Sequence, residues 1–419
     1  MGKFIIEESG PLQGRVRISG SKNSVLPIIA ATLLTDKTCI ISDVPRLTDV
    51  LVMQNLIEDF GGSTAWDQKN ERLTIRNTNI NKTEASYELC AKMRASFLVA
   101  GPILARMGEV RVSLPGGCAI GTRPVDLHLK GLAALGAEIS TEHGFICARA
   151  KKLRGTNIYL DFPSVGATEN IMMAAVLAQG QTIIQNSAVE PEIVDLANFL
   201  SACGAKIRGS GTDTIRINGV DELHGAEHTI IPDRIEAGTF MLAAAATGGD
   251  IRITNTVPDH LRPAIAKLRE ANVQIEEFGD EIAIAGGGQR RPIDIKTMPY
   301  PGFPTDMQAQ FVAMLATTRG TNIITETIFE NRFMHIPEFK RMGAEIKIDS
   351  RSAIIEGVEK LTGTQVKATD LRAGAALILA ALRAEGQTEI HDIYHIDRGY
   401  CAFDEKLRNL GAKIIRIDE

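Results

Sequence analysis

The chain has 419 residues, more than a single hydrophobic core usually organises, so two domains are expected. Hydrophobic residues make up 44% and charged residues 23% of the sequence, which is the mix of a soluble globular protein. The net charge of −5 argues against a nucleic-acid-binding protein, and it means that an anionic ligand must be held by local positive charge.

The N-terminus and the cysteines indicate the compartment. The first ten residues lack the apolar core and the cleavage site of a signal peptide. The longest apolar runs, such as residues 171–178, are much shorter than the roughly 20 residues that span a bilayer. The cysteines are scattered without a C-x-x-C pair, and they are Cys39, Cys90, Cys118, Cys147, Cys203 and Cys401. We therefore expect a cytoplasmic protein with free thiols and no membrane contact.

A pattern of about seventy residues recurs along the whole chain. In each copy a helix ends in an apolar residue, a glycine or asparagine follows, and a short alternating strand comes next. The residues at this position are Gly61, Gly136, Gly204, Asn272, Gly343 and Gly411. Glycine and asparagine tolerate the left-handed conformation that closes a helix, so each is predicted to be a helix C-cap.

A second series of segments lies between these caps. The segments are rich in alanine and apolar on most faces, and they cover residues 24–34, 94–105, 169–178, 237–246, 309–318 and 373–382. A helix that is apolar all round is buried. A β-branched strand follows each segment, for example at residues 181–188. One repeat therefore reads strand, buried helix, strand, loop, surface helix, strand.

Six such repeats in one chain predict an α/β protein with two domains of three repeats each. A TIM barrel is disfavoured because it has eight shorter units with one helix each. An open solenoid is disfavoured because neither end of the sequence shows a polar capping repeat.

Polar residues stand where each buried helix is expected to begin. Ser164, Asp233 and Asp370 can be explained as ordinary N-caps. Lys22, Arg94 and Arg372 cannot, because positive charge is unfavourable at a helix N-terminus. A cation is favourable there when an anion lies between it and the helix end, so these positions predict an anion-binding site.

The loop at residues 114–128 is the most distinctive segment between repeats. Three glycines surround Cys118, which is typical of a mobile lid, and Arg123 follows five residues later. A nearby cation raises thiol reactivity, although an inert thiol on a loop stays the alternative. The histidines show no convincing metal-ligand spacing, and no phosphate-binding glycine motif is present.

Motifs from one end of the chain to the other resemble those of the UDP-N-acetylglucosamine 1-carboxyvinyltransferases, in the enolpyruvyl transferase family. They are SGSKN (19–23), LPGGCAIGTRPVDLH (114–128), SVGAT (164–168), EPEIVD (190–195), FPTDMQAQF (303–311), ETIFENRFMHIPE (326–338), ATDLRA (368–373) and YHIDRGY (394–400). The resemblance implies two inside-out α/β barrel-like domains, each with three strand-helix-strand-helix-strand repeats around buried helices. Their bounds would be residues 21–231 and residues 1–20 plus 232–419, with the substrate cleft between them.

The resemblance also implies an activity and a set of site residues. The family transfers the enolpyruvyl group of phosphoenolpyruvate to the 3-hydroxyl of UDP-N-acetylglucosamine, releases phosphate, and so commits the sugar to peptidoglycan synthesis. Phosphoenolpyruvate would be held by Lys22, Asn23, Arg94, Arg123 and Arg398. The nucleotide sugar would contact Asn23, Arg94, Arg123, Pro124, Val125, Asp126, Leu127, Ser164, Val165, Gly166, Asp306 and Ile328. Arg332, Asp370 and Arg372 would form the wall of the cleft.

The reaction needs a base for the sugar hydroxyl and an acid for the enol carbon. We expect Asp306 to be the base and either Cys118 or Lys22 to be the acid. Cys118 would also be the target of the epoxide fosfomycin, a phosphoenolpyruvate-like inhibitor of the family. No metal or organic cofactor is expected, because phosphoenolpyruvate is already activated.

Two alternative functions stay open at this point. A shikimate-phosphate enolpyruvyl transferase shares the donor, although Cys118 and the ENRFMH segment argue against it. A catalytically idle paralogue with a regulatory role is also conceivable. Two departures from many relatives remove positive charge and leave open how the diphosphate is neutralised: Phe162-Pro163 stands where Lys-Val is common, and Thr48 stands where some have lysine.

Overall fold

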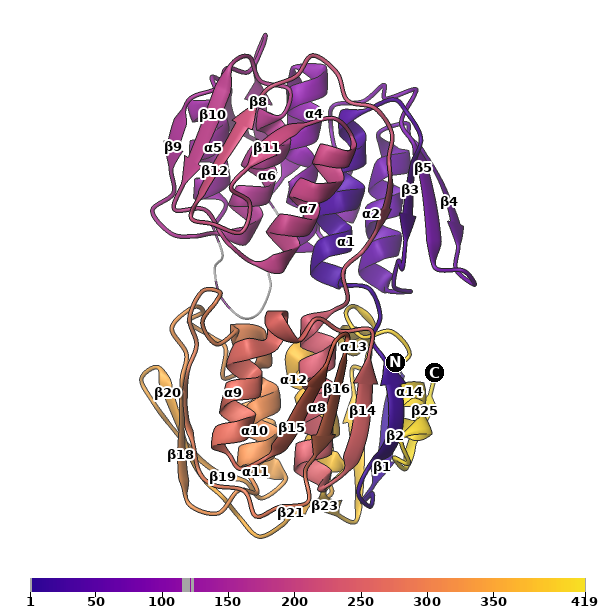
Figure 1. The fold of residues 1–419 in the computed structure, drawn as a ribbon, viewed down its shortest axis with the longest axis vertical. Coiled ribbons are helices and arrows are strands. Elements are labelled where there is room, and N and C mark those ends of the chain that lie inside the picture. The colour runs from indigo at the N-terminus through magenta and orange to yellow at the C-terminus, as the bar shows by residue number, and fades with distance from the viewer. Residues whose placement is uncertain (1, 115–120, 122–123, 419) are drawn as a thin grey trace. The chain divides into compact units, whose positions relative to one another are not determined.

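A computed structural model describes residues 2–114, 121 and 124–418 (Figure 1). These residues form two compact units. The continuous unit runs from Gly20 to Ile231. The split unit combines the chain before Gly20 with the chain from Pro232 onward, and Gly121 groups with it.

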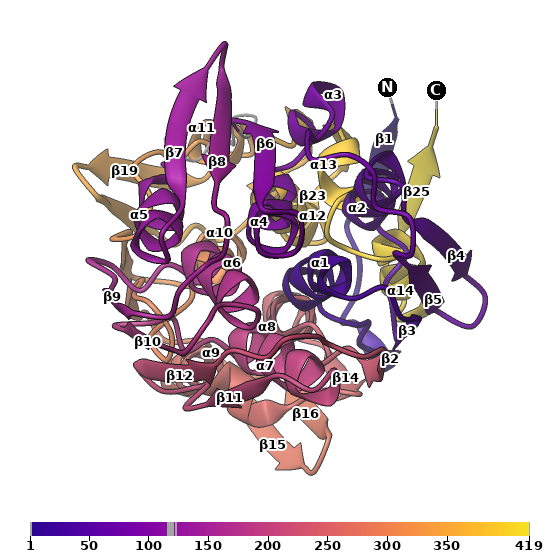
Figure 2. The ribbon, with the colours of Figure 1, turned by 90° about the horizontal axis from the view of Figure 1, so that it is seen from above.

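In the continuous unit, the described residues form sheets with the strand orders β13-β3-β5-β4, β6-β8-β7 and β11-β12-β10-β9. Figure 2 shows α1, α4 and α6 in the middle of this unit with the sheets around them. The strands are β3 (Cys39–Ser42), β4 (Ser63–Asp67), β5 (Arg72–Arg76), β6 (Glu109–Ser113), β7 (Glu138–Glu142), β8 (Phe145–Arg149), β9 (Asn157–Tyr159), β10 (Gln181–Gln185), β11 (Lys206–Arg208), β12 (Thr214–Asn218) and β13 (Glu227–Thr229). The helices are α1 (Lys22–Ala31), η1 (Thr32–Leu34), α2 (Thr48–Asp59), α3 (Tyr87–Cys90), η2 (Arg94–Val99), α4 (Ala100–Met107), α5 (Asp126–Ala134), α6 (Val165–Ala175) and α7 (Pro191–Ala202), where η marks a 3-10 helix.

The described residues of the split unit form sheets with the orders β22-β24-β1-β25, β15-β16-β14-β2 and β17-β18-β20-β19, and the short pair β21-β23. The strands are β1 (Lys3–Glu7), β2 (Gln13–Arg17), β14 (Asp250–Thr254), β15 (Gln274–Phe278), β16 (Glu281–Ala285), β17 (Asp294–Lys296), β18 (Thr321–Thr325), β19 (Glu345–Asp349), β20 (Ser352–Glu356), β21 (Leu361–Thr362), β22 (Gln365–Lys367), β23 (Ala384–Glu385), β24 (Gln387–His391) and β25 (Ile414–Ile417). The helices are α8 (Arg234–Thr247), η3 (Pro258–Leu261), α9 (Arg262–Glu270), η4 (Thr305–Met307), α10 (Gln308–Leu315), α11 (Ile336–Arg341), α12 (Leu371–Ala381), α13 (Tyr394–Asp397) and α14 (Phe403–Asn409).

The repeats around α6 and α10 each build one sheet from their own strands by the same pairing rule, whereas β3 takes β13 and β14 takes β2 as the parallel partner. The strand after the buried helix pairs in parallel with the strand before that helix, as β10 does with β9. It pairs antiparallel on its other side with the last strand of the repeat, as β10 does with β12. The register places Ile184 opposite Ile158 and Ile215, and all three side chains are buried. The inward face of the sheet is therefore a continuous apolar layer.

The predicted α/β repeat is confirmed, including its buried helices and its caps. Every residue from Ile235 to Thr247 in α8 is buried, and α8, α10 and α12 pack against one another. The predicted C-cap residues all have positive φ, from 67° at Asn272 to 100° at Gly61 and Gly204. A left-handed residue ends each surface helix because it turns the chain back toward the sheet.

The first residues of the chain complete sheets of the split unit. β1 lies between β24 and β25, and β2 pairs with β14. A partly buried ion pair fixes the end of this segment, because Lys406 contacts both Glu236 and the Ser19 hydroxyl. None of the helices in the described part of the chain has the length and hydropathy of a membrane span.

Candidate active site

The buried helices of the split unit begin with polar residues, and some of these are ordinary caps. Asp233 caps α8 by accepting from the amides of Ile235 and Glu236 at 2.8 and 3.0 Å. Asp370 caps α12 in the same way, with bonds of 2.8 and 3.1 Å to the amides of Arg372 and Ala373. The N-cap interpretation therefore holds for both aspartates.

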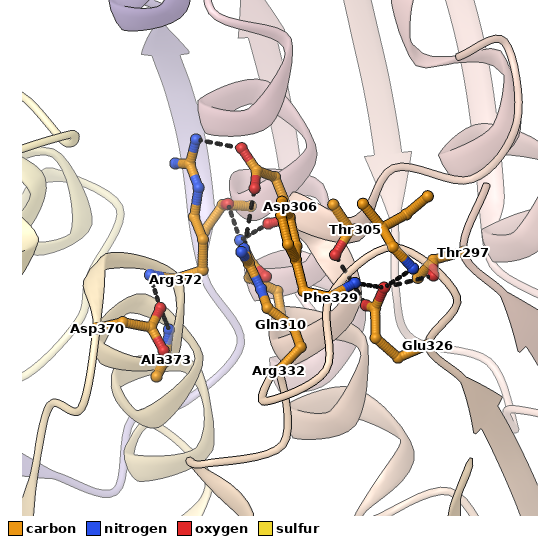
Figure 3. A network of polar contacts seen from close by, with 12 residues as sticks. Thr297, Thr305, Asp306, Gln310, Glu326, Phe329, Arg332, Asp370, Arg372 and Ala373 are labelled. Atoms are coloured by element: carbon orange, nitrogen blue, oxygen red, sulfur yellow. Dashed lines mark hydrogen bonds and ion pairs between the residues drawn. The ribbon is translucent and has the colours of Figure 1, made fainter. Parts of the chain in front are cut away.

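Asp306 has a different environment at the start of α10. It lies in η4, and its carboxylate binds two arginines (Figure 3). Oδ1 accepts from Nη2 of Arg332 at 2.9 Å, and Oδ2 accepts from Nη2 of Arg372 at 3.1 Å. Both arginine side chains are almost fully buried, whereas the Asp306 side chain is 29% exposed. The cluster thus has two cations for one anion, with the carboxylate nearest to solvent.

The charges around Asp306 decide its protonation state. Burial by itself would raise the pKa of the Asp306 carboxyl, but the charges of Arg372 and Arg332 outweigh it and hold the pKa well below its usual range. Burial would lower the pKa of Arg372, and the Asp306 charge reverses this and raises it. Asp306 is therefore a carboxylate at every physiological pH, able to accept a hydrogen bond from a hydroxyl group.

A buried polar network packs against the cluster of Asp306, Arg332 and Arg372. The Tyr400 ring lies 5.4 Å from the Arg372 guanidinium carbon, and its hydroxyl is 3.0 Å from Thr239 Oγ1. Gln310 donates from Nε2 to the Tyr400 hydroxyl at 3.1 Å and to the backbone carbonyl of Asp306 at 2.9 Å. Nη1 of Arg372 is buried and has no hydrogen-bond partner among the described residues. This nitrogen is a donor that an anionic ligand could satisfy.

The remaining predicted residues of the split unit lie in the loops after the helices and strands named above. Ile328 is in the loop after β18, and its amide donates to Glu326 at 2.7 Å. Arg332 belongs to the same loop. Arg398 is the C-cap of α13, two residues before Tyr400. Of the predicted residues in this unit, the structure brings Asp306, Arg332 and Arg372 into contact.

In the continuous unit, Lys22 is the first residue of α1. Its Nζ lies 3.0 Å from Oδ2 of Asp49 in α2, and the Lys22 side chain is 13% exposed. The cation at this helix N-terminus is therefore accompanied by a carboxylate, as the helix dipole requires. Asn23 follows in the first turn and is half-buried.

Arg94 joins two of the predicted substrate segments. It begins η2, and its Nη2 donates to the backbone carbonyl of Pro124 at 3.0 Å. Val125 is the N-cap of α5, so Asp126 and Leu127 occupy the first turn of that helix.

Ser164 caps α6, where its hydroxyl oxygen accepts from the amide of Ala167 at 3.4 Å. Gly166 lets α6 approach α5 closely, because a Cβ atom there would lie 3.1 Å from the His128 ring. Burial and then the Arg94 charge lower the pKa of His128 to about 3, so His128 is neutral and packs between the helices. Val165 and Gly166 stand at the N-terminus of α6, beside the start of α5.

A carboxyl group further along α6 has surroundings opposite to those of Asp306. Glu169 is buried next to the start of α7, where Glu190 is the N-cap and Glu192 lies in the first turn. Burial raises the pKa of the Glu169 carboxyl well above its usual range, and the charges of Glu192 and Glu190 raise it further. The surroundings of Glu169 therefore favour the neutral carboxyl, whereas those of Asp306 favour the carboxylate.

Cys118 and Arg123 lie outside the described residues. The other cysteines, Cys39, Cys90, Cys147, Cys203 and Cys401, are all buried and none forms a disulfide. Among the residues that the structure describes, no group of three or more histidine, cysteine or acidic side chains could hold a metal ion.

The sequence analysis missed several residues that organise the site. Asp49 has the pattern of an ordinary acidic residue in the first turn of a helix, so nothing marked it as the partner of Lys22. Gln310 and Tyr400 both lie inside quoted motifs, FPTDMQAQF and YHIDRGY. The available signal was the pair Gln308 and Gln310 in the otherwise apolar buried helix α10, because a buried polar group needs partners.

Comparisons with known proteins cover the whole chain. A model of the EPSP synthase (3-phosphoshikimate 1-carboxyvinyltransferase) family matches residues 6–407. UDP-N-acetylglucosamine 1-carboxyvinyltransferase 1 of Caldanaerobacter subterraneus subsp. tengcongensis is 63% identical over 414 residues, which cover 99% of each chain. UDP-N-acetylglucosamine 1-carboxyvinyltransferase 2 of Carboxydothermus hydrogenoformans is 59% identical over 421 residues and 100% of each chain.

Solved structures agree with this similarity. The enolpyruvyl transferase NikO from Streptomyces tendae superposes with a TM-score of 0.91 at 26% identity, over 99% of each chain. An EPSP synthase from Acinetobacter baumannii has a TM-score of 0.78 at 19% identity and shares the fold.

Proposed function

The chain belongs to the enolpyruvyl transferase family, and we propose that it transfers the enolpyruvyl group of phosphoenolpyruvate to the 3-hydroxyl of UDP-N-acetylglucosamine. Phosphate is the second product. The observation that carries the choice of acceptor is the end-to-end identity of 63% with a UDP-N-acetylglucosamine 1-carboxyvinyltransferase. The product would enter peptidoglycan synthesis.

The reaction proceeds by addition and then elimination. The sugar hydroxyl oxygen bonds to C2 of phosphoenolpyruvate, C3 gains a proton, and the hydroxyl proton passes to a base. The tetrahedral ketal then loses a proton from C3, the bond from C2 to the phosphate oxygen breaks, and the C2–C3 double bond returns. The donor is already activated, so the scheme needs neither a metal ion nor an organic cofactor.

Asp306 is the proposed acceptor of the hydroxyl proton. Its carboxylate is ionised and partly open to solvent, so a hydroxyl group can reach it. In the absence of substrate, Arg332 and Arg372 both bind Asp306, and this makes its carboxylate a weak base. An anionic substrate that draws off Arg332 or Arg372 would strengthen the base as the substrate binds, which couples binding to the chemistry.

The cations are proposed to hold the two anionic substrates. Lys22 and Arg398, with Arg123, would bind the phosphate and carboxylate of phosphoenolpyruvate, and Arg94 and Asn23 would assist. Charge-assisted bonds of this kind also stabilise charge that builds up during the reaction. Lys22 is ion-paired to Asp49 and has a compact ammonium group, which makes it one candidate for the C3 proton donor, and Cys118 is the other.

The contacts proposed for the nucleotide sugar are those that the family resemblance assigns to it. The residues in the continuous unit would be Pro124 to Leu127 and Ser164 to Gly166, at the starts of α5 and α6. The residues in the split unit would be Asp306 and Ile328, with Arg332, Asp370 and Arg372 beside them.

Phosphate release tests the proposal. We expect release when phosphoenolpyruvate and UDP-N-acetylglucosamine are present together, and none with either alone. Because the matching family model is named for 3-phosphoshikimate, that compound is the second acceptor to try. Release with 3-phosphoshikimate in place of the nucleotide sugar would reassign the acceptor, and no release with either acceptor would favour an idle paralogue.

A further inference from the structure

Glu326 is a buried carboxyl group that lies outside the proposed substrate contacts. It follows the last residue of β18 and is 1% exposed. A carboxylate in such a place is unfavourable unless it is fully hydrogen-bonded. Oε1 accepts from the Thr297 hydroxyl at 2.8 Å and from the amides of Ile328 and Phe329 at 2.7 and 3.2 Å. Oε2 accepts from the Thr305 hydroxyl at 2.8 Å.

The donors come from separate segments of the split unit. Thr297 follows β17, Thr305 opens η4, and Ile328 and Phe329 form the turn that leaves β18 (Figure 3). The contact with Thr297 is reinforced, because the Thr327 hydroxyl donates to the Thr297 carbonyl at 2.6 Å and the Thr327 amide donates to Thr297 Oγ1 at 2.8 Å. Glu326 therefore ties two strand ends and the start of η4 together through one carboxylate.

Two of these segments lead directly to the Asp306 cluster. Asp306 is the residue after Thr305, and Arg332 lies in the loop that continues from Phe329. The two arms meet again where Arg332 Nη2 binds Asp306 Oδ1 at 2.9 Å. The Thr305–Glu326 bond closes this ring at its base.

We propose that Glu326 is a positioning residue, which sets the separation of Asp306 and Arg332 by holding the bases of both arms. This inference rests on the proposed role of Asp306 in the transfer reaction. The alternative is that Glu326 only stabilises the turn after β18. The two differ at Thr305, because the Thr305 bond does not involve the turn at all.

The test removes the Thr305 bond and leaves the turn intact. Thr305→Val deletes one hydroxyl from a half-buried side chain, while Oε1 of Glu326 keeps its bonds to the turn. We expect kcat for phosphate release to fall about tenfold, with the KM for phosphoenolpyruvate changed less than about twofold, because small misplacement of a reacting group acts on the transition state. Thr305→Ser restores the hydroxyl and should restore kcat to within about twofold.

A matched control lies on β18, the strand that leads to Glu326. At the opposite end of β18, the Thr321 hydroxyl donates to Glu356 at 2.7 Å in an exposed position. Thr321→Val removes a bond of the same kind and should leave kcat unchanged. An equal loss in Thr321→Val would show that any weakening of β18 lowers activity, and it would overturn the positioning role.

Combining Thr305→Val with Asp306→Asn tests whether the loss of kcat acts through Asp306. If Thr305 and Glu326 act through Asp306, Thr305→Val should cost less than about twofold there, because effects along one chain of contacts are not additive. A full tenfold loss in that background, or wild-type kcat in Thr305→Val alone, contradicts the inference. A wild-type protein that releases no phosphate would instead contradict the proposed function, and the positioning role with it.

Discussion

Two carboxyl groups, one in each unit, have pKa values that their surroundings shift in opposite directions. Asp306 in the split unit is bound by two arginines, and its pKa is depressed. Glu169 in the continuous unit faces Glu192 and Glu190, and its pKa is raised. Both lie in or near the first turns of buried helices. The surroundings, and not the residue type or the helix position, therefore decide the direction in which each pKa is shifted.

The difference assigns different tasks to the two groups. A carboxylate that two cations keep ionised can accept a proton or orient a hydroxyl. A protonated carboxyl next to two others can donate one hydrogen bond and is otherwise part of the packing. Each prediction below changes a group on one side of this comparison.

The largest effect is expected at Asp306. Asp306→Asn removes the proposed base and should lower turnover about 10²-fold or more, with nucleotide-sugar binding largely intact. Glu169→Gln is the matched variant, because an amide resembles a protonated carboxyl, and its turnover at neutral pH should stay near that of the wild type. Steady-state phosphate release together with calorimetric binding measures both. Near-normal turnover in Asp306→Asn would remove Asp306 from the mechanism.

The cations proposed for phosphoenolpyruvate should show the next largest effect. Lys22→Ala and Arg398→Ala each delete a charge-assisted contact, typically worth about 1.5–3 kcal/mol, so kcat/KM for phosphoenolpyruvate should fall about tenfold to a hundredfold. The binding constant for the nucleotide sugar should change far less. Equal losses for both substrates would contradict the assignment of these residues to the phosphoenolpyruvate anion.

Thiol alkylation should depend on the cations proposed for phosphoenolpyruvate and not on Asp306. Fosfomycin is expected to modify Cys118 alone, because the other cysteines are buried. Lys22→Ala should slow the modification, since it removes a contact to the anionic epoxide, whereas Asp306→Asn should leave its rate within about twofold. Timed peptide mapping, with and without UDP-N-acetylglucosamine, measures the rate, and we expect the nucleotide sugar to increase it.

A substitution at Cys118 separates proton donation from alkylation. Cys118→Asp should abolish the modification and retain measurable turnover, because a carboxyl can donate a proton but reacts poorly with an epoxide. Modification of Cys39, Cys90, Cys147, Cys203 or Cys401 at a comparable rate would contradict the prediction.

The smallest effect is on stability, and its sign is opposite for the two carboxyls. Glu169 has a raised pKa, so its contribution is present at low pH and is lost as pH rises. Glu169→Gln should therefore gain stability relative to the wild type as the pH rises above the ordinary Glu range. Asp306 has a depressed pKa, so its contribution is present above the ordinary Asp range and is lost as pH falls below about 4. The advantage of the wild type over Asp306→Asn should shrink there. Urea midpoints across pH measure both trends, and parallel trends in the two variants would contradict the comparison.

The sequence predicted those features that local chemistry decides. The C-caps, from Gly61 to Gly411, follow from the few residue types that adopt positive φ. The buried helices follow from composition alone, as in α8. The cations at Lys22 and Arg372 stood out because they oppose the helix dipole.

The partners of those cations could not be predicted, because tertiary packing supplies them. Asp49 lies in a different helix from Lys22, and Glu326 reaches Thr305 from the end of a strand. Sequence spacing does not show that such segments meet. The raised pKa of Glu169 could not be predicted for the same reason, since Glu190 and Glu192 begin the next helix along the chain.

Transfer of labelled carbon tests the central claim most directly. The enzyme would be incubated with phosphoenolpyruvate carrying ¹³C at C3 and with unlabelled UDP-N-acetylglucosamine, and the nucleotide sugar would be isolated for mass spectrometry and carbon NMR. We predict that the label appears in an enol ether on the sugar, in an amount equal to the phosphate released. Phosphate release with all of the label left in pyruvate, or with an unmodified nucleotide sugar, would contradict enolpyruvyl transfer.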